Sequence, residues 1–146
     1  MRALFRLVAA VLFVAVIVQI ALAAYGGFHA VHAAKHASIS KKTIDNGFNP
    51  HISLGYIIVI VMIALLLIAV AGRLGQSSIR WSGVILILGV VQAILGSVSE
   101  SVPAIGPLHG LNALAIFATT GLLAHRSWTA MNVPASPTEP EAVAGT

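Results

Sequence analysis

The chain has 146 residues, of which 58% are hydrophobic and only 8% are charged. About a quarter of the residues of a soluble domain are charged, so this composition excludes a soluble globular protein and indicates an integral membrane protein. The net charge of +4 is spread between apolar runs and forms no basic patch, which argues against nucleic acid binding. The absence of cysteine excludes disulfides, thiolate metal sites and cysteine nucleophiles.

Four apolar runs predict four transmembrane helices, at about residues 7–26, 52–72, 81–99 and 106–126. The first run follows two arginines and resembles a signal peptide, but it exceeds the 7–15 residues of a signal core, so a retained helix is favoured. We therefore predict an all-α fold, a bundle of four transmembrane helices over residues 1–130. Residues 131–146 are rich in proline and are expected to form a disordered cytoplasmic tail.

The cations predict the orientation of the helices in the cell membrane. Arginines mark one set of helix ends, and lysines mark the longer loop on the other side. The two sets are Arg2, Arg6, Arg73, Arg80 and Arg126 against Lys35, Lys41 and Lys42. Because cations near helix ends favour the cytoplasmic side, both termini are expected in the cytoplasm.

The sequence also contains an internal repeat of two helix pairs, and both pairs cross the membrane in the same direction. The segments IVQIAL (17–22) and VVQAIL (90–95) correspond, and each is followed by a loop, a proline, a histidine and an apolar helix. A proline at the first helical position would place His51 and His109 in the first turns of the second and fourth helices. His51 precedes Arg73 by 22 residues and His109 precedes Arg126 by 17, a depth mismatch of about 8 Å unless the fourth helix continues past Arg126.

Two histidines at matching positions on different helices suggest a shared ligand. Bis-imidazole ligation of a b-type haem iron through His51 and His109 is the natural candidate in a chain without cysteine. Small residues would leave room for a porphyrin against the helix faces, and these are Gly55, Ala113, Gly89 and Gly96. The alternative is that these small residues only allow close helix packing.

Segments 89–96 (GVVQAILG) and 108–114 (LHGLNAL) resemble the third and fourth helices of one half of the haem A synthase family. The resemblance covers roughly Leu7 to Arg126 and implies histidines of the second and fourth helices facing each other across a haem. A small uncharacterised family of four-helix membrane proteins fits the sequence equally well. The synthases have a carboxylate and an arginine where this chain has Phe48 and Ile52, so the resemblance implies a scaffold and a haem rather than the enzyme activity.

Other polar residues have weaker interpretations. His29, His32 and His36 would share one face of a continued first helix, as a metal site, a proton path or, as we favour, a solvated helical extension. Gln19 and Gln92 are expected to form hydrogen bonds between helices. Glu100 is expected to hold a cation, to pair with Lys41 or Lys42, or to be solvated.

The sequence thus predicts a multi-pass protein that binds haem b for electron transfer, or as an accessory of a respiratory or haem-handling complex. The alternative is a non-catalytic membrane interaction protein without a cofactor. The expected partners are the lipid bilayer and either a larger membrane complex or a second copy in a homodimer.

Overall fold

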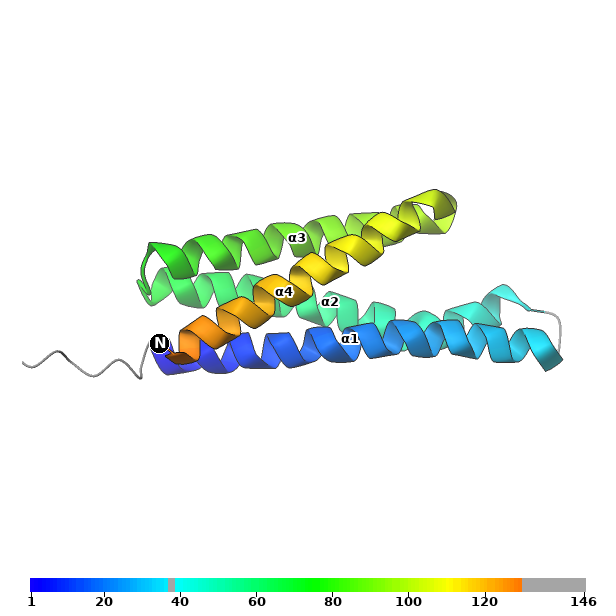
Figure 1. Ribbon diagram of the computed structural model, residues 1–146, viewed down its shortest axis with the longest axis horizontal. Coiled ribbons are helices and arrows are strands. Elements are labelled where there is room, and N and C mark those ends of the chain that lie inside the picture. Colours follow the sequence, from blue (N-terminus) through cyan, green and yellow to red (C-terminus); the bar gives the residue numbers. More distant parts are fainter. Residues whose placement is uncertain (37–38, 130–146) are drawn as a thin grey trace, which may run out of the picture.

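A computed structural model describes residues 1–36 and 39–129, and within them the chain is folded as a helical bundle (Figure 1). The four long helices are α1 (Arg2–His36), α2 (Lys41–Ala71), α3 (Gln76–Ser101) and α4 (Gly106–Thr129), and a 3-10 turn, η1 (Pro103–Ile105), precedes α4. All four are long and apolar enough to cross a membrane. The predicted four-helix transmembrane bundle is confirmed, and the protein is a multi-pass membrane protein. The expected tail at 131–146 lies outside the described residues.

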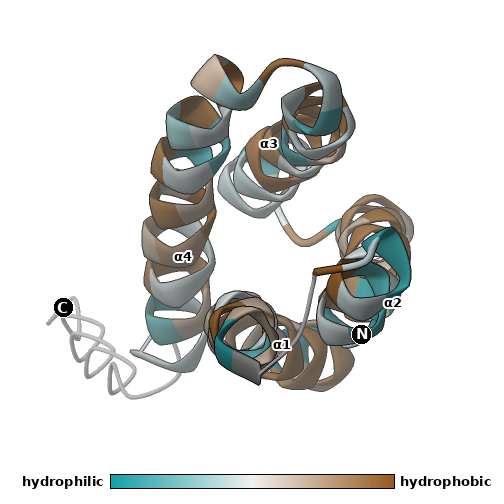
Figure 2. Cartoon of the chain, turned by 90° about the vertical axis from the view of Figure 1, so that its right-hand side faces the viewer, coloured by the Kyte–Doolittle hydropathy of each residue, from teal (hydrophilic) through white to brown (hydrophobic). Residues whose placement is uncertain are grey.

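The four helices form a ring in which each helix contacts two neighbours (Figure 2). The neighbouring pairs are α1 and α2, α2 and α3, α3 and α4, and α4 and α1. The backbones of the diagonal pairs, α1 with α3 and α2 with α4, do not come into contact in the described chain. Side chains alone must therefore fill the centre of the ring.

Met1, the turn between α2 and α3 and the end of α4 lie at one end of the bundle, which we call the arginine end (Figure 1). The opposite end, with the α1–α2 and α3–α4 connections, is the histidine end. The buried core fills the half next to the arginine end. On α1 it uses Phe5, Ala9, Leu12 and Val16, spaced so that they share one helix face. Large side chains of α2 and α3, among them Met62, Leu65 and Ile85, complete it.

Local contacts tie the helices together at the arginine end. The guanidinium of Arg126 stacks over Trp81 at 5.6 Å and that of Arg6 over Trp128 at 5.5 Å. The turn after α2 is a Schellman motif, because the Leu74 N–H donates to the Ala69 carbonyl and the Arg73 N–H to that of Val70. Arg73 has φ +47°, the left-handed conformation this motif requires.

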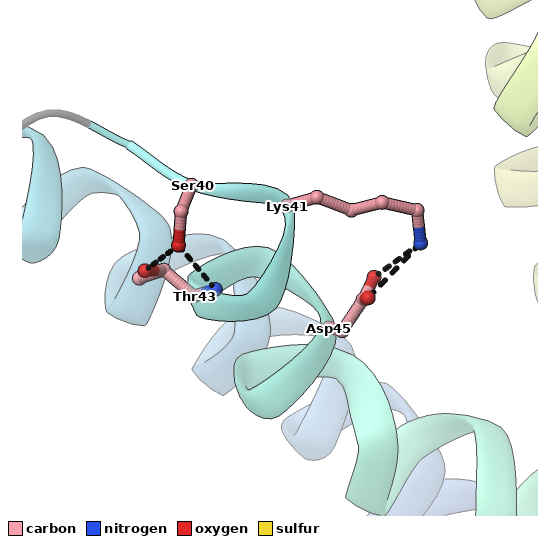
Figure 3. Close-up of polar contacts among 4 residues, drawn as sticks. All are labelled: Ser40, Lys41, Thr43 and Asp45. Carbon is pink, nitrogen blue, oxygen red and sulfur yellow. Dashed lines mark hydrogen bonds and ion pairs between the residues drawn. The ribbon is translucent and has the colours of Figure 1, made fainter.

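The helix boundaries at the histidine end differ from those predicted. The first helix was expected to end near 26 and the second to begin near 52, with Pro50 in its first turn. In the structure α1 continues to His36, α2 begins at Lys41, and Pro50 lies inside α2. The actual start is fixed by Ser40, whose hydroxyl accepts from the Thr43 N–H at 3.2 Å, and by the Lys41–Asp45 pair at 2.9 Å (Figure 3). His51 therefore lies about three turns into its helix.

The start of the fourth helix agrees with the prediction. α4 begins at Gly106, so Pro107 and His109 lie in its first turn as expected. It also continues past Arg126 to Thr129, in the direction that reduces the predicted depth mismatch.

The α1–α2 hairpin extends beyond α3 and α4 at the histidine end (Figure 1). α1 has 35 residues, which is about 52 Å of helix against about 30 Å of hydrocarbon. The extended part is held by glycines: a Cβ on Gly26 would meet the Phe48 ring at 2.7 Å, and one on Gly47 would meet the His29 ring at 2.9 Å. α1 thus continues as a helix past residue 26, as the favoured interpretation expected, and His29 is packed against α2 rather than fully solvated.

We expect Gly26→Ala to lower the stability of the hairpin by about 1–3 kcal/mol, because the added methyl would overlap the Phe48 ring and force the ring or the helix backbone to shift. Gly27→Ala is the matched control, since a Cβ there meets nothing within 4 Å. Thermal unfolding of the two variants in detergent, followed by circular dichroism, compares them. Equal melting temperatures would contradict the close packing of α1 on α2.

Candidate functional site

A cavity of about 1080 Å³ lies between the four helices in the half of the bundle next to the histidine end. Its lining is mainly apolar, with two imidazoles and two carboxamides among the side chains. All the site residues predicted from the sequence line it: His51, His109, Gly55, Ala113, Gly89 and Gly96. The structure thus brings together residues of three helices, α2, α3 and α4, whereas the repeat indicated only which sequence positions correspond.

The cavity has an apolar floor and a charged mouth. Val16, Ile58, Met62 and Ile116, which belong to the buried core, close it toward the arginine end. Lys41, Asp45 and Glu100 line it toward the histidine end. Lys41 pairs with Asp45, and Figure 3 shows this pair on the side of α2 that faces away from α1. A ligand in this cavity would therefore have a dry apolar part and a polar end near a lysine.

His51 is held by one residue of the neighbouring helix, Gln19 of α1. The Nδ1 atom of His51 lies 3.0 Å from the Gln19 carbonyl oxygen. The Gln19 carboxamide nitrogen donates to the His51 carbonyl at 2.8 Å and lies 3.3 Å from the His51 Nε2. Both ends of the glutamine thus engage the same histidine.

His109 repeats this arrangement in the second helix pair. Its Nδ1 lies 3.1 Å from the carbonyl oxygen of Gln92 on α3, and its Nε2 lies 3.1 Å from the Gln92 carboxamide nitrogen. The prediction that Gln19 and Gln92 form hydrogen bonds between helices is confirmed. The internal repeat is therefore a repeated pair of residues, a glutamine on the first helix and a histidine on the second.

These contacts fix the tautomer of both imidazoles. A backbone carbonyl can only accept, so Nδ1 carries the proton and donates to it. Nε2 then has a free lone pair, which accepts from the glutamine N–H₂ group. A histidine whose other ring nitrogen donates to a backbone carbonyl is oriented in the way that metal-binding histidines usually are.

The two imidazoles face each other although their helices do not touch. Their ring centroids are 6.3 Å apart, with the planes at 64°. Two imidazole nitrogens on one metal ion lie about 4 Å apart, and each ring centre lies about 1 Å further out, which gives about 6 Å between centroids. The observed separation is compatible with a shared ion, and it also lies within the range of about 4.5–7 Å of an ordinary edge-to-face ring contact.

The glycines at the cavity serve different purposes. A Cβ on Gly96 would approach the His109 Cε1 to 3.2 Å, and one on Gly55 would approach the Gln19 carboxamide nitrogen to 3.1 Å. One on Gly89 would overlap the Met62 sulfur. Gly96 and Gly55 therefore let the polar groups reach the cavity. Gly89 also lines the cavity, but it packs against the core side chain Met62 and adds no further space for a ligand.

The second pair has a polar residue that sequence reasoning left without a role. Asn112, one turn after His109, donates to the Leu88 carbonyl at 2.9 Å and to the Gln92 side-chain oxygen at 2.7 Å. The corresponding residue after His51 is Leu54, and the side-chain oxygen of Gln19 is buried without a partner. The position of Asn112 three residues after His109, on the same helix face, was the sequence feature that could have indicated this role.

The charged mouth was also missed. Lys41 was placed in the loop because α2 was expected to begin at Pro50, and only the longer helix carries Lys41 and Asp45 to the cavity. Glu100 lines the same mouth, whereas the described partner of Lys41 is Asp45 rather than Glu100.

Among the described residues, no group of three or more histidines, cysteines or acids could hold a metal ion. The outer histidines do not gather into such a group there, and the ring of His29 lies 5.9 Å from that of Tyr25. His51 and His109 are a pair, so they fall short of the three or four protein ligands of a zinc site. Two axial ligands are what a porphyrin iron needs from the protein.

Residues 43–98 match a protein family of unknown function (DUF6220). The match spans α2 and most of α3, less than half of the chain, and it includes His51 and Gln92. Comparison with curated proteins gives no match, and neither does comparison with solved structures.

We expect Gln92→Leu to destabilise the protein more than Gln19→Leu, by about 1–2 kcal/mol, because it leaves one N–H of the Asn112 amide and the His109 Nε2 without partners, while Asn112 keeps its bond to the Leu88 carbonyl. Adding Asn112→Leu to Gln92→Leu should recover part of the loss, since the orphaned donor is then gone. Melting temperatures of the four proteins in detergent measure the differences. Equal effects of the two single glutamine variants would argue against the hydrogen-bond assignment.

Proposed function

We propose that the protein binds one b-type haem between α2 and α4, with His51 and His109 as the two axial ligands. The observation that carries the proposal is the pair of facing imidazoles, 6.3 Å apart, on helices whose backbones do not touch. Each has its Nδ1–H fixed by a carbonyl, and each Nε2 lone pair accepts from a glutamine N–H that a metal would have to displace. A flat group held between the two imidazoles would occupy the centre of the ring of helices.

The cavity around the pair supports this ligand class. Its volume of about 1080 Å³ is at the upper end of the about 300–1000 Å³ typical of small-molecule sites, as a group the size of a porphyrin needs. Its walls are apolar, which suits the macrocycle, and the Lys41 ammonium at the mouth can pair with carboxylates of a ligand. The macrocycle would then lie deep in the cavity with its acidic edge toward the histidine end.

The chemistry expected of such a site is electron transfer. A bound haem supplies a one-electron redox centre, and two imidazole ligands leave it no position for a substrate. Phe48 and Ile52 line the cavity where the resemblance to haem A synthase would place a carboxylate and an arginine. The residues present therefore favour an electron carrier, or an accessory of a respiratory or haem-handling complex, over a synthase.

The proposal includes an orientation in the cell membrane. Five arginines belong to the arginine end, and such cations favour the cytoplasmic side. The haem site would then lie near the outer surface, where a redox partner of the outer face can reach it. A larger membrane complex or a second copy would dock on the apolar faces turned toward lipid.

We expect the purified protein, supplied with haem, to show sharp reduced α and β bands of a six-coordinate haem. His51→Ala and His109→Ala should each abolish that spectrum, because one axial ligand is lost. His125→Ala is the control, since His125 is exposed near the end of α4 and does not line the cavity. Oxidised and reduced absorption spectra provide the measurement.

An unchanged spectrum in either ligand variant would disprove the assignment of that ligand. A wild-type protein that binds no added haem would instead favour the alternative, a membrane interaction protein without a cofactor.

We expect reporter fusions after Thr129 to report a cytoplasmic location, and fusions between His36 and Lys41 to report the outer side. The arginines near the helix ends set this direction. Replacing Arg2 and Arg6 by glutamine should increase the fraction of inverted molecules, with Lys41→Gln as the control. A fusion after Thr129 that reports an outer location would reverse the proposed placement of the site.

A further inference from the structure

The two halves of the site differ at the residue that follows each histidine by three positions. In the second helix pair, Asn112 links the Leu88 carbonyl to the Gln92 side-chain oxygen, and Gln92 in turn donates to the His109 Nε2. We call this chain of hydrogen bonds the Asn112 latch. In the first pair Leu54 occupies the place of Asn112, and no latch exists.

The difference decides how firmly each glutamine occupies the histidine nitrogen. Gln19 makes its shorter bond, 2.8 Å, to the His51 carbonyl, and its contact with the His51 Nε2 is 3.3 Å. It can leave that nitrogen and keep the shorter bond. Gln92 has no such second acceptor among its hydrogen bonds, and Asn112 holds its oxygen at 2.7 Å. Gln92 therefore competes for the lone pair of its histidine, and Gln19 does so only weakly.

We infer that His109 is the exchangeable ligand and His51 the permanent one, an inference that rests on the haem proposal. If the His109 Nε2 left a bound iron, its lone pair would accept the Gln92 N–H, with no electron or proton transferred. The vacated side would then be open to a small neutral diatomic gas.

The surroundings of His109 are tight on one side and open on another. His109 lies against Gly96, where a Cβ would approach the ring to 3.2 Å. Gly106, three residues before His109, lines the same cavity, and nothing lies within 4 Å of the place where its Cβ would be, so the open space is on that side.

Carbon monoxide titration of the reduced haem protein tests the inference. Asn112→Leu removes the latch, so Gln92 can turn away, His109 binds more firmly, and the affinity for carbon monoxide should fall about 2- to 10-fold. Leu54→Asn offers a donor to the buried Gln19 oxygen. It should raise the affinity for carbon monoxide, because His51 then becomes exchangeable as well. Thr119→Val is the control, because that hydroxyl bonds only within α4, to the Ala115 and Ile116 carbonyls.

The single histidine variants give a second readout. His109→Ala should retain haem as a five-coordinate species that binds carbon monoxide without competition, whereas His51→Ala should lose most of its haem. The reverse pattern, or a carbon monoxide affinity that neither Asn112→Leu nor Leu54→Asn changes, would overturn the inference while haem binding stands. A wild-type protein without haem would overturn the proposed function and this inference together.

The latch itself can be measured without haem. In the protein labelled with ¹⁵N-histidine, the His109 Nε2 resonance should show an accepted hydrogen bond that is lost in Asn112→Leu. Unchanged melting temperatures of Asn112→Leu and Leu54→Asn would show that the effects on carbon monoxide do not come from unfolding. A His109 resonance that is the same in wild type and Asn112→Leu would contradict the latch.

Discussion

The site depends on two hydrogen bonds in which an imidazole Nδ1–H donates to a backbone carbonyl of the adjacent helix, at 3.0 and 3.1 Å. These carbonyls already accept within their own helices, and their second lone pair is the only acceptor the ring needs. In a low-dielectric interior an imidazole without such a partner would be costly, so the bond sets both the helix pairing and the direction of Nε2. A glutamine supplies the carbonyl and a carboxamide at once, which is why one residue per helix pair suffices.

The ring of helices provides the space into which those nitrogens point. Near the arginine end, Leu12, Leu65 and Ile85 fill the centre and hold the helices together. Toward the histidine end, α3 and α4 diverge from α1 and α2 (Figure 1), and a cavity lined in part by glycines lies between the helices. The buried core and the site thus lie at different levels along the bundle axis. They meet at four residues that belong to the core and also form the floor of the cavity, Val16, Ile58, Met62 and Ile116.

Much of this architecture follows from composition and the repeat. Charge scarcity locates the helices, and the two glutamine–histidine pairs locate the cavity, because buried polar residues in a membrane bundle must find each other. The start of α2 was not predictable in this way. Pro50 resembles a helix start, and only the Ser40 cap and the packing of Gly26 on Phe48 show that the helix begins earlier. The role of Asn112 also depends on tertiary structure, since its partners, Leu88 and Gln92, are on another helix.

The contact between α1 and α4 joins the first helix of the described chain to the last. During synthesis, α1 to α3 enter the membrane before the ring can close, and until α4 arrives the future cavity is an open trough facing lipid. The His109 side of the site does not exist at that stage. A ligand held by both His51 and His109 would therefore acquire its second contact only once α4 has joined α1, so the order of helix insertion would set when the site is complete.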